Sequence, residues 1–251
     1  MLRFMNKKSQ ITIFIIIAIA IIAGLILFFS VKSGVFEKEK VSPDITFIYN
    51  FVDGCIEKTG EDANYNIGKT GGYFLYSNSS TQNGIAYYFD KNKKLIISKE
   101  EIENQLSLYV NEMLFFCTKN FVDFPDFAVS QGEIKTKTKI VKDKVIFTIG
   151  YPLTISKNNR NYFIKNFEKQ ISSRLDTIYK VAFGITEEQM LDFKNICINC
   201  LSDLAFENKV FVSMNEDIYD KNIIIFILID DQHKLNGEDY RFYFANRYDL
   251  D

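Results

Sequence analysis

The sequence predicts an α+β protein: an N-terminal transmembrane helix followed by an extracytoplasmic domain of antiparallel strands and several helices. Two observations lead to this prediction. The chain opens with an uninterrupted apolar run over residues 11–29. Beyond it, segments with helical spacing and segments with two-residue alternation occur in blocks rather than in regular alternation, which favours α+β. A doubly wound sheet is the lesser alternative.

The apolar run has the properties of a membrane-spanning helix. Its nineteen residues include nine Ile, two Leu and three Phe, and a helix of this length spans about 28 Å, close to the thickness of a bilayer's hydrocarbon core. A buried helix of a soluble protein would show a polar stripe, and a cleavable secretion signal has a shorter apolar region. The residues expected to form the anchor are Ile11, Phe14, Ile17, Ile21, Leu25 and Phe28.

The distribution of charge and length sets the expected orientation. The short N-terminal tail carries three basic residues and no acidic one, and long domains are translocated largely regardless of their charge. We therefore expect the protein at the cell membrane, with its N-terminus cytoplasmic and its C-terminal domain outside. The predicted parts are a cytoplasmic tail (1–9), a transmembrane helix (10–31), a linker (32–43) and the extracytoplasmic domain (44–251).

The segment around the start of the apolar run resembles the leader of archaeal type IV pilin-like proteins, the class III signal sequence. Lys7 and Lys8 match its basic stretch, and Ser9 and Gln10 match the small residue and the Gln between which a dedicated peptidase cuts. The resemblance therefore implies possible processing before Gln10 and, as an alternative role, a pilin-like subunit. Phe14 stands where such pilins typically carry a Glu that places one subunit against the next.

The whole chain also resembles single-pass membrane proteins of archaea with reduced genomes, which begin with similar KKxQITIFIII segments and continue into a cysteine-bearing part. That resemblance implies a location at the archaeal cell surface and no particular activity. The expected partners are membrane lipid, other cell-surface proteins or a second copy of the chain. The formal net charge of −2 offers no broad basic field for nucleic acid.

Four cysteines suit an oxidising compartment, where they can pair in three ways. Cys55 and Cys117 each lie on the apolar side of a predicted helix, so we favour a bridge between these two. Cys197 and Cys200 are close in sequence, and a bridge between them at helical spacing would be strained. The alternative is four free, buried thiols that behave as small hydrophobic groups.

The first half of the predicted domain contains two helices separated by short strands. Pro43 and the apolar spacing after it predict a helix over 44–59. Ser98, with Glu101 three residues later, forms a capping box that opens a second helix reaching Cys117. Gly71 and Gly72 interrupt the chain between the two helices. Short strands are expected at 73–76, 85–89 and 95–97.

The second half begins with a meander of strands, followed by two helices and three more strands. The meander is expected at 127–141, 144–155 and 161–164, with turns at Lys142-Asp143 and Asn158-Asn159. The helices are expected at 166–182 and 187–206, the second opened by Thr186 with Gln189 at the capping-box spacing. The later strands are expected at 209–213, 222–229 and 240–245, of which the second is apolar enough for a buried central strand.

Several patterns invite a catalytic interpretation, but none of them provides a full set of groups. Gly68-Lys69-Thr70 matches a relaxed phosphate loop, but it follows a polar segment instead of an apolar strand, so no nucleotide is expected. Cys197 and Cys200 could be a redox pair of a surface thiol enzyme, although the predicted helix places Cys197 about ten residues from its N-terminus.

A metal site lacks ligands in this sequence. The sole histidine, His233, lies in a predicted polar loop, and zinc would need two ligands besides a Cys-x-x-Cys pair. A single histidine also disfavours a Ser/His/Asp or Cys/His hydrolase. We therefore expect no cofactor, no metal and no catalytic activity.

A row of lysines is the clearest two-residue pattern in the chain. Lys135, Lys137 and Lys139 share one face of a predicted strand. They could bind an anionic surface, or they could form a solvated face that protects a sheet edge. Taken together, the sequence predicts a membrane-anchored structural or binding protein of the archaeal cell surface.

Overall fold

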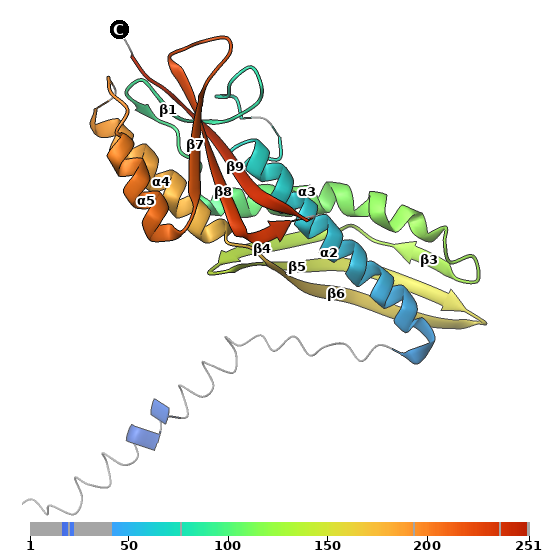
Figure 1. Ribbon diagram of the computed structural model, residues 1–251. Coiled ribbons are helices and arrows are strands. Elements are labelled where there is room, and N and C mark those ends of the chain that lie inside the picture. The colour runs from blue at the N-terminus through green and yellow to red at the C-terminus, as the bar shows by residue number, and fades with distance from the viewer. Residues whose placement is uncertain are drawn as a thin grey trace, which may run out of the picture. The chain divides into compact units, whose positions relative to one another are not determined.

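The computed structural model describes residues 17–19, 21–22, 42–75, 77–192, 194–235 and 237–249. The segments from residue 42 onward fold as one unit in which helices pack against two β-sheets (Figure 1). This arrangement is α+β, as the sequence predicts.

The predicted membrane anchor lies mostly outside the described residues. Ile17 and Ile21 belong to short helical segments, whereas Ser9, Gln10, Ile11, Phe14, Leu25 and Phe28 are not described. Among the described residues, no helix combines the length and the apolar character needed to cross a membrane. The transmembrane helix therefore stays a prediction.

The larger sheet has five strands, and the apolar strand predicted from the sequence, β8 (Ile223–Leu235), is one of its interior strands. The strand order is β2 (Lys93–Lys94), β1 (Tyr87–Asp90), β9 (Glu238–Arg247), β8 and β7 (Phe211–Glu216). All neighbouring pairs are antiparallel except β1 with β9, which is parallel. Phe226 of β8 stacks on Phe244 of β9, with 5.0 Å between the ring centroids, and both are fully buried.

The smaller sheet is built around one long strand. β5 (Lys144–Lys157) pairs along its whole length with β6 (Arg160–Ser172), and on its other side with β4 (Lys135–Val141) and then β3 (Ala128–Gln131). The pairing register shifts between Gly150 and Leu153. Pro152 lies within this irregular stretch, where a strand tolerates the loss of a backbone N–H.

Two long helices connect the sheets. α2 (Thr46–Lys69) contacts β6 of the smaller sheet and β8 and β9 of the larger one, and α3 (Lys99–Thr118) lies beside α2 and against β4 (Figure 1). The predicted N-cap at Ser98 is confirmed, because the Glu101 N–H donates to Ser98 Oγ at 3.1 Å, whereas the Glu101 carboxylate accepts from the Gln105 side chain at 2.8 Å. The predicted end of the first helix at residue 59 is wrong. Buried Ala63 and Ile67 continue the apolar face for about ten more residues.

The strand expected at 127–141 is two strands, β3 and β4, and residues 95–97 form no strand, since β2 ends at Lys94. Two further predicted elements are wrong for reasons of packing. Residues 166–172 belong to strand β6, not to a helix. The buried residues of this strand have a helix-like spacing: Ile164, Phe167 and Ile171. This spacing arises because the register shift in β5 interrupts the two-residue alternation between Ile164 and Phe167. Residues 73–75 form no strand. Instead, Phe74 packs edge-on against Tyr109 of α3.

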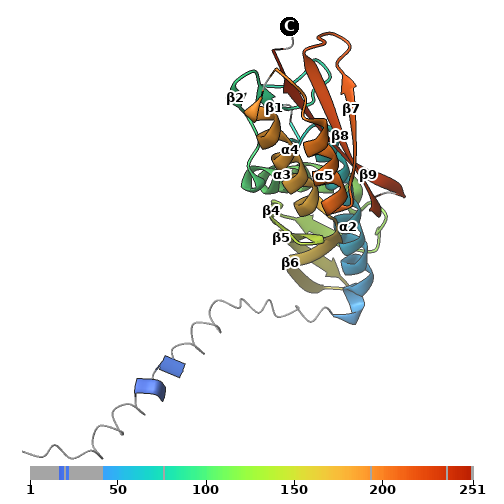
Figure 2. The ribbon, with the colours of Figure 1, turned by 60° about the vertical axis from the view of Figure 1, so that its left-hand side comes forward.

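The helices after β6 also differ from the prediction. α4 (Leu175–Leu191) starts later than expected and runs through the predicted start at Thr186, and α5 (Ile198–Asn208) is a separate helix beside α4 (Figures 1 and 2). Thr186 is inside α4, where its hydroxyl donates to the Ala182 carbonyl at 3.0 Å. The predicted helix over 187–206 is therefore two helices joined by the segment 192–197.

Candidate functional site

The joint between α4 and α5 changes the environment of the Cys-x-x-Cys pair. Cys197 is the N-cap residue of α5, and Cys200 lies in its first turn. The sequence-based placement of Cys197 deep inside a helix is therefore wrong. The position matters chemically, because the first turn of a helix presents free N–H groups and the positive end of the helix dipole.

The chain leaves the helical path at Asp192. Its carboxylate accepts hydrogen bonds from the Lys194 N–H at 3.1 Å and from the Asn195 side chain at 2.8 Å. These bonds lower the pKa of Asp192, because the charged form is the better acceptor. Such a local side-chain turn competes with the helix and ends it.

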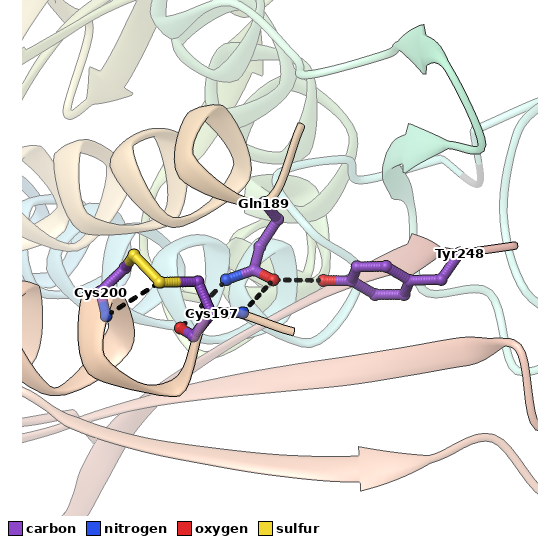
Figure 3. Close-up of a disulfide and its surroundings, with 4 residues drawn as sticks. All are labelled: Gln189, Cys197, Cys200 and Tyr248. Atoms are coloured by element: carbon purple, nitrogen blue, oxygen red, sulfur yellow. Dashed lines mark hydrogen bonds between the residues drawn. A yellow bond between two sulfur atoms is a disulfide. The ribbon is translucent and has the colours of Figure 1, made fainter. Parts of the chain in front are cut away.

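Gln189 holds the backbone of Cys197 in place (Figure 3). Its side-chain oxygen accepts from the Cys197 N–H at 3.1 Å, and its side-chain amide donates to the Cys197 carbonyl at 3.3 Å. The Tyr248 hydroxyl donates to the same Gln189 oxygen at 3.1 Å. Gln189 is only 1% exposed and Tyr248 is buried, so α4, the C-terminal segment and the start of α5 meet at one fixed point.

The two sulfur atoms form a disulfide with a Cα–Cα distance of 5.4 Å, within the usual range. The Cys200 N–H donates to the Cys197 sulfur at 3.3 Å. Both residues are partly exposed. The other disulfide, Cys55–Cys117, confirms the pairing favoured from the sequence, and Cys55 within it is only 4% exposed. All four cysteines are therefore paired, and the alternative of four free thiols is wrong.

A groove of about 950 Å³ lies between α5 and β7. Ile198, which lies between the two cysteines in sequence, is one of its lining residues. The helix wall is mostly apolar, and the strand wall contains Phe211, Val212 and Met214. Two aromatic rings on these walls are strongly exposed: Phe206 at 86% and Phe211 at 62%.

A buried ion pair fixes the other end of α5. The Arg174 guanidinium donates to Asp230 Oδ1 at 2.6 Å and to the Lys209 carbonyl at 3.3 Å, just after the end of the helix. A cation at this position is favourable next to the negative end of the helix dipole. His233, expected in a loop, belongs to β8, and its Nδ1 lies 3.9 Å from Asp230 Oδ2. Within the described residues, no three acidic, histidine or cysteine side chains are grouped to hold a metal ion.

The lysine row lies on the solvent face of β4, as its alternation predicts. Lys135, Lys137 and Lys139 are all exposed. Lys139 pairs with Glu103 at 2.7 Å, and Lys135 pairs with Glu133 at 2.9 Å. These two lysines therefore have local counter-ions, and binding to an anionic surface stays a prediction.

The segment that resembles a phosphate loop is helical. Gly68 and Lys69 form the end of α2, and Thr70 is its C-cap. A side chain at Gly68 would lie 2.5 Å from the Arg241 carbonyl oxygen, so the helix and β9 are in direct contact here. Because glycine has no Cβ, this position lets α2 pack closely against β9.

Comparison with known proteins gives no relative. No family model matches the chain, and neither the curated proteins nor the solved structures contain a match. The site therefore has to be interpreted from its own geometry.

Sequence reasoning missed the groove residues and the contact of Gln189 with Cys197. Gln189 appeared only as a capping residue of a helix that does not start there. The sequence pattern around Phe206 and Phe211 does not distinguish an exposed aromatic ring from a buried one. Only the position of α5 on the sheet reveals them.

Proposed function

We propose that this protein is a membrane-anchored, extracytoplasmic binding protein whose domain over 44–251 takes up an apolar segment of another cell-surface polypeptide. The observation that carries the proposal is the groove between α5 and β7, with Phe206 and Phe211 exposed on its walls. Covering an aromatic side chain contributes about 1.5–3 kcal/mol. Two such rings therefore supply a substantial part of the affinity of a weak complex.

The strand wall of the groove suits a polypeptide ligand. Within the described residues, β7 pairs only with β8, so its outer edge has backbone N–H and C=O groups available. An extended segment can add to such an edge through main-chain hydrogen bonds while its side chains enter the adjacent groove. Together, the edge and the groove favour a polypeptide over a small apolar molecule.

The cysteines and the apolar run support the location. All four cysteines are in disulfides, and disulfides persist in oxidising compartments outside the cytoplasm. The run over 11–29 has the length and composition of a membrane anchor. Protease treatment of intact cells tests this location. We expect the domain to be digested from outside while the protein stays in the membrane fraction; full protection of the domain until lysis would contradict the proposal.

Binding is tested with a fluorescent, cysteine-free peptide rich in Val, Ile and Phe, compared with a peptide of the same length in which these residues are Ser and Asn. We expect the apolar peptide to bind selectively, and Phe206→Asp and Phe211→Asp to weaken its binding at least about tenfold. Phe163→Asp is the matched control, because Phe163 is also strongly exposed, at 64%, but belongs to β6 and does not line the groove. Equal effects of all three substitutions would contradict a groove site.

A pilin-like subunit is the alternative, supported by the leader residues around Ser9 and Gln10. It requires a mature protein that begins at Gln10 and is present in sheared filaments. Amino-terminal sequencing of the purified native protein decides between them: an intact N-terminus excludes the processed subunit.

A further inference from the structure

We propose that the Cys197–Cys200 disulfide is a redox site that exchanges with cysteine pairs of polypeptides. This activity goes beyond binding, and its substrate class rests on the proposed function of the groove. The two disulfides of this chain occupy different environments. The long-range disulfide joins α2 to α3 and pairs buried Cys55 with partly exposed Cys117, whereas Cys197 and Cys200 are both partly exposed at the start of a helix. An incoming thiolate can therefore approach either sulfur of Cys197–Cys200 but only the Cys117 sulfur of the long-range disulfide.

The hydrogen bonds that hold the backbone of Cys197 do not depend on the disulfide. Gln189 holds both the N–H and the carbonyl of Cys197, and Tyr248 holds Gln189 (Figure 3). None of these bonds involves a sulfur atom. When the disulfide opens, the backbone of Cys197 therefore stays at the N-cap position of α5.

The helix favours the charged form of the Cys197 sulfur after reduction. The Cys200 N–H already donates to this sulfur at 3.3 Å, and the sulfur lies at the positive end of an eleven-residue helix. Both features stabilise a thiolate. A stabilised thiolate is a good leaving group, so the disulfide form is an oxidant for suitable dithiols.

The groove defines which polypeptides the disulfide meets. Ile198 follows Cys197 directly in sequence and lines the groove, although neither cysteine is itself a lining residue. A polypeptide segment with apolar side chains in the groove brings a neighbouring cysteine next to Cys197. The substrate class is therefore a cysteine pair next to an apolar, extended segment.

The exchange balances without any further reagent. A substrate thiolate attacks the Cys197 sulfur, forms a mixed disulfide and releases Cys200 as a thiolate, which takes up a proton. The second substrate thiolate then attacks the substrate sulfur of the mixed disulfide and releases Cys197. The substrate dithiol has become a disulfide, and Cys197 and Cys200 have taken up its two electrons. Of the two protons that the substrate thiols lost, one goes to the Cys200 thiolate and the other goes to solvent, because Cys197 leaves as a thiolate. The reverse sequence reduces a substrate disulfide.

The first test uses the full-length protein in detergent, equilibrated with buffers of reduced and oxidised glutathione. Free thiols are alkylated, and the peptides that carry the two cysteine pairs are quantified by mass. We expect Cys197–Cys200 to open reversibly at glutathione ratios at which Cys55–Cys117 stays closed. Opening of both pairs together, or of Cys55–Cys117 first, would overturn the proposal.

The second test traps the mixed disulfide. The Cys200→Ser variant is incubated with peptides whose single cysteine carries a thionitrobenzoate group, so that attack by Cys197 releases a coloured thiolate. We expect release with an apolar peptide to be roughly tenfold faster than with a polar one, and Phe206→Asp to remove the difference. Equal rates for both peptides would overturn the assigned substrate class. If the Cys200→Ser variant folds poorly, the first test can still disprove the proposal, because it uses the unsubstituted chain.

The two proposals fail in different ways. If the unsubstituted protein binds the cysteine-free apolar peptide but Cys197–Cys200 does not open before Cys55–Cys117, the redox site is wrong and the binding function stands. If the disulfide exchanges but the apolar peptide does not bind, the redox site stands and the groove is not its docking surface.

Discussion

At the scale of single residues, Glu103 shows how a buried carboxylate protects the edge of a sheet. Together with Ser107 and Asn111, it lies along one side of α3 that faces the outer edge of β4, and the Ser107 hydroxyl donates to the Thr138 hydroxyl at 2.8 Å. Its Oε1 accepts from the Ile140 N–H at 2.9 Å, and Asn111 accepts from the Thr136 N–H at 2.8 Å. The edge of the smaller sheet is therefore covered by a helix, which prevents pairing with other chains.

Replacing Glu103 should be costly. Glu103→Leu leaves the buried Ile140 N–H without an acceptor, so we expect a loss of about 1–3 kcal/mol in the free energy of unfolding. Glu103→Gln keeps an acceptor and should lose less. Lys139→Ala removes only the exposed partner and serves as the control, with little change expected. Urea denaturation gives these differences; a large effect of Lys139→Ala would show that the ion pair, not the edge bond, is the important contact.

Asp176 predicts how stability depends on pH. Burial alone would raise the pKa of its carboxyl group, but hydrogen bonds from Lys180 and Lys99 outweigh burial and lower the pKa. A pKa that is lower in the folded state stabilises the fold above the unfolded pKa of about 3.9, and this contribution is lost as the pH falls through the folded value. We expect Asp176→Asn to lower stability by about 1–2 kcal/mol at neutral pH.

The difference between Asp176→Asn and the unsubstituted protein should shrink as the pH falls below about 4, because the unfolded carboxyl takes up its proton first and the folded one follows at lower pH. Thermal denaturation between pH 3 and pH 7 measures it. A difference that stays constant over this range would exclude Asp176 as the titrating group.

At the scale of helices and strands, the sequence predicts the types of most elements and misplaces their ends. Turn residues locate β5, a continuous apolar run locates β8, and the N-cap Ser98 locates the start of α3. The predictions of element bounds fail where contacts between residues far apart in the sequence determine the local structure. The bulge near Pro152 in β5 changes the burial pattern of β6, and the contact of α2 with both sheets extends that helix beyond its glycines. Cys197 becomes an N-cap residue because the turn at Asp192 ends α4. The sequence does not predict this turn, because the helical spacing of apolar residues is similar on both sides of it.

Two glycines of α2, Gly54 in its interior and Gly68 near its C-terminal end, provide a matched pair of substitutions. A Cβ at Gly54 meets nothing within 4 Å, whereas a Cβ at Gly68 would lie 2.5 Å from the Arg241 carbonyl oxygen. Gly54→Ala should therefore stabilise the protein by up to about 1 kcal/mol through helix propensity. Gly68→Ala should destabilise it by about 1–3 kcal/mol, because β9 has to move. Melting temperatures of the two variants test this, and a stable Gly68→Ala variant would contradict the close contact of α2 with β9.

At the scale of the whole molecule, the two disulfides differ in how much they contribute to the stability of the fold. Cys55–Cys117 spans 62 residues and joins the two long helices that hold the sheets together, whereas Cys197–Cys200 spans three residues within one joint. A cross-link stabilises a fold mainly by restricting the unfolded chain, and the effect grows with the length of the closed loop. The long-range disulfide is therefore the structural one, and the short one contributes less to stability.

This division predicts unequal costs for removing the two disulfides. Cys55→Ala with Cys117→Ala should lower the free energy of unfolding by about 4 kcal/mol, the value expected for a loop of this length. Cys197→Ala with Cys200→Ala should lower it by no more than roughly 1–2 kcal/mol. Denaturant titration of both double variants, with the unsubstituted protein as reference, measures the contrast. Similar costs for both pairs would mean that Cys197–Cys200 is needed to hold α5 on the sheet, and a redox site there would then have to open at the expense of the fold.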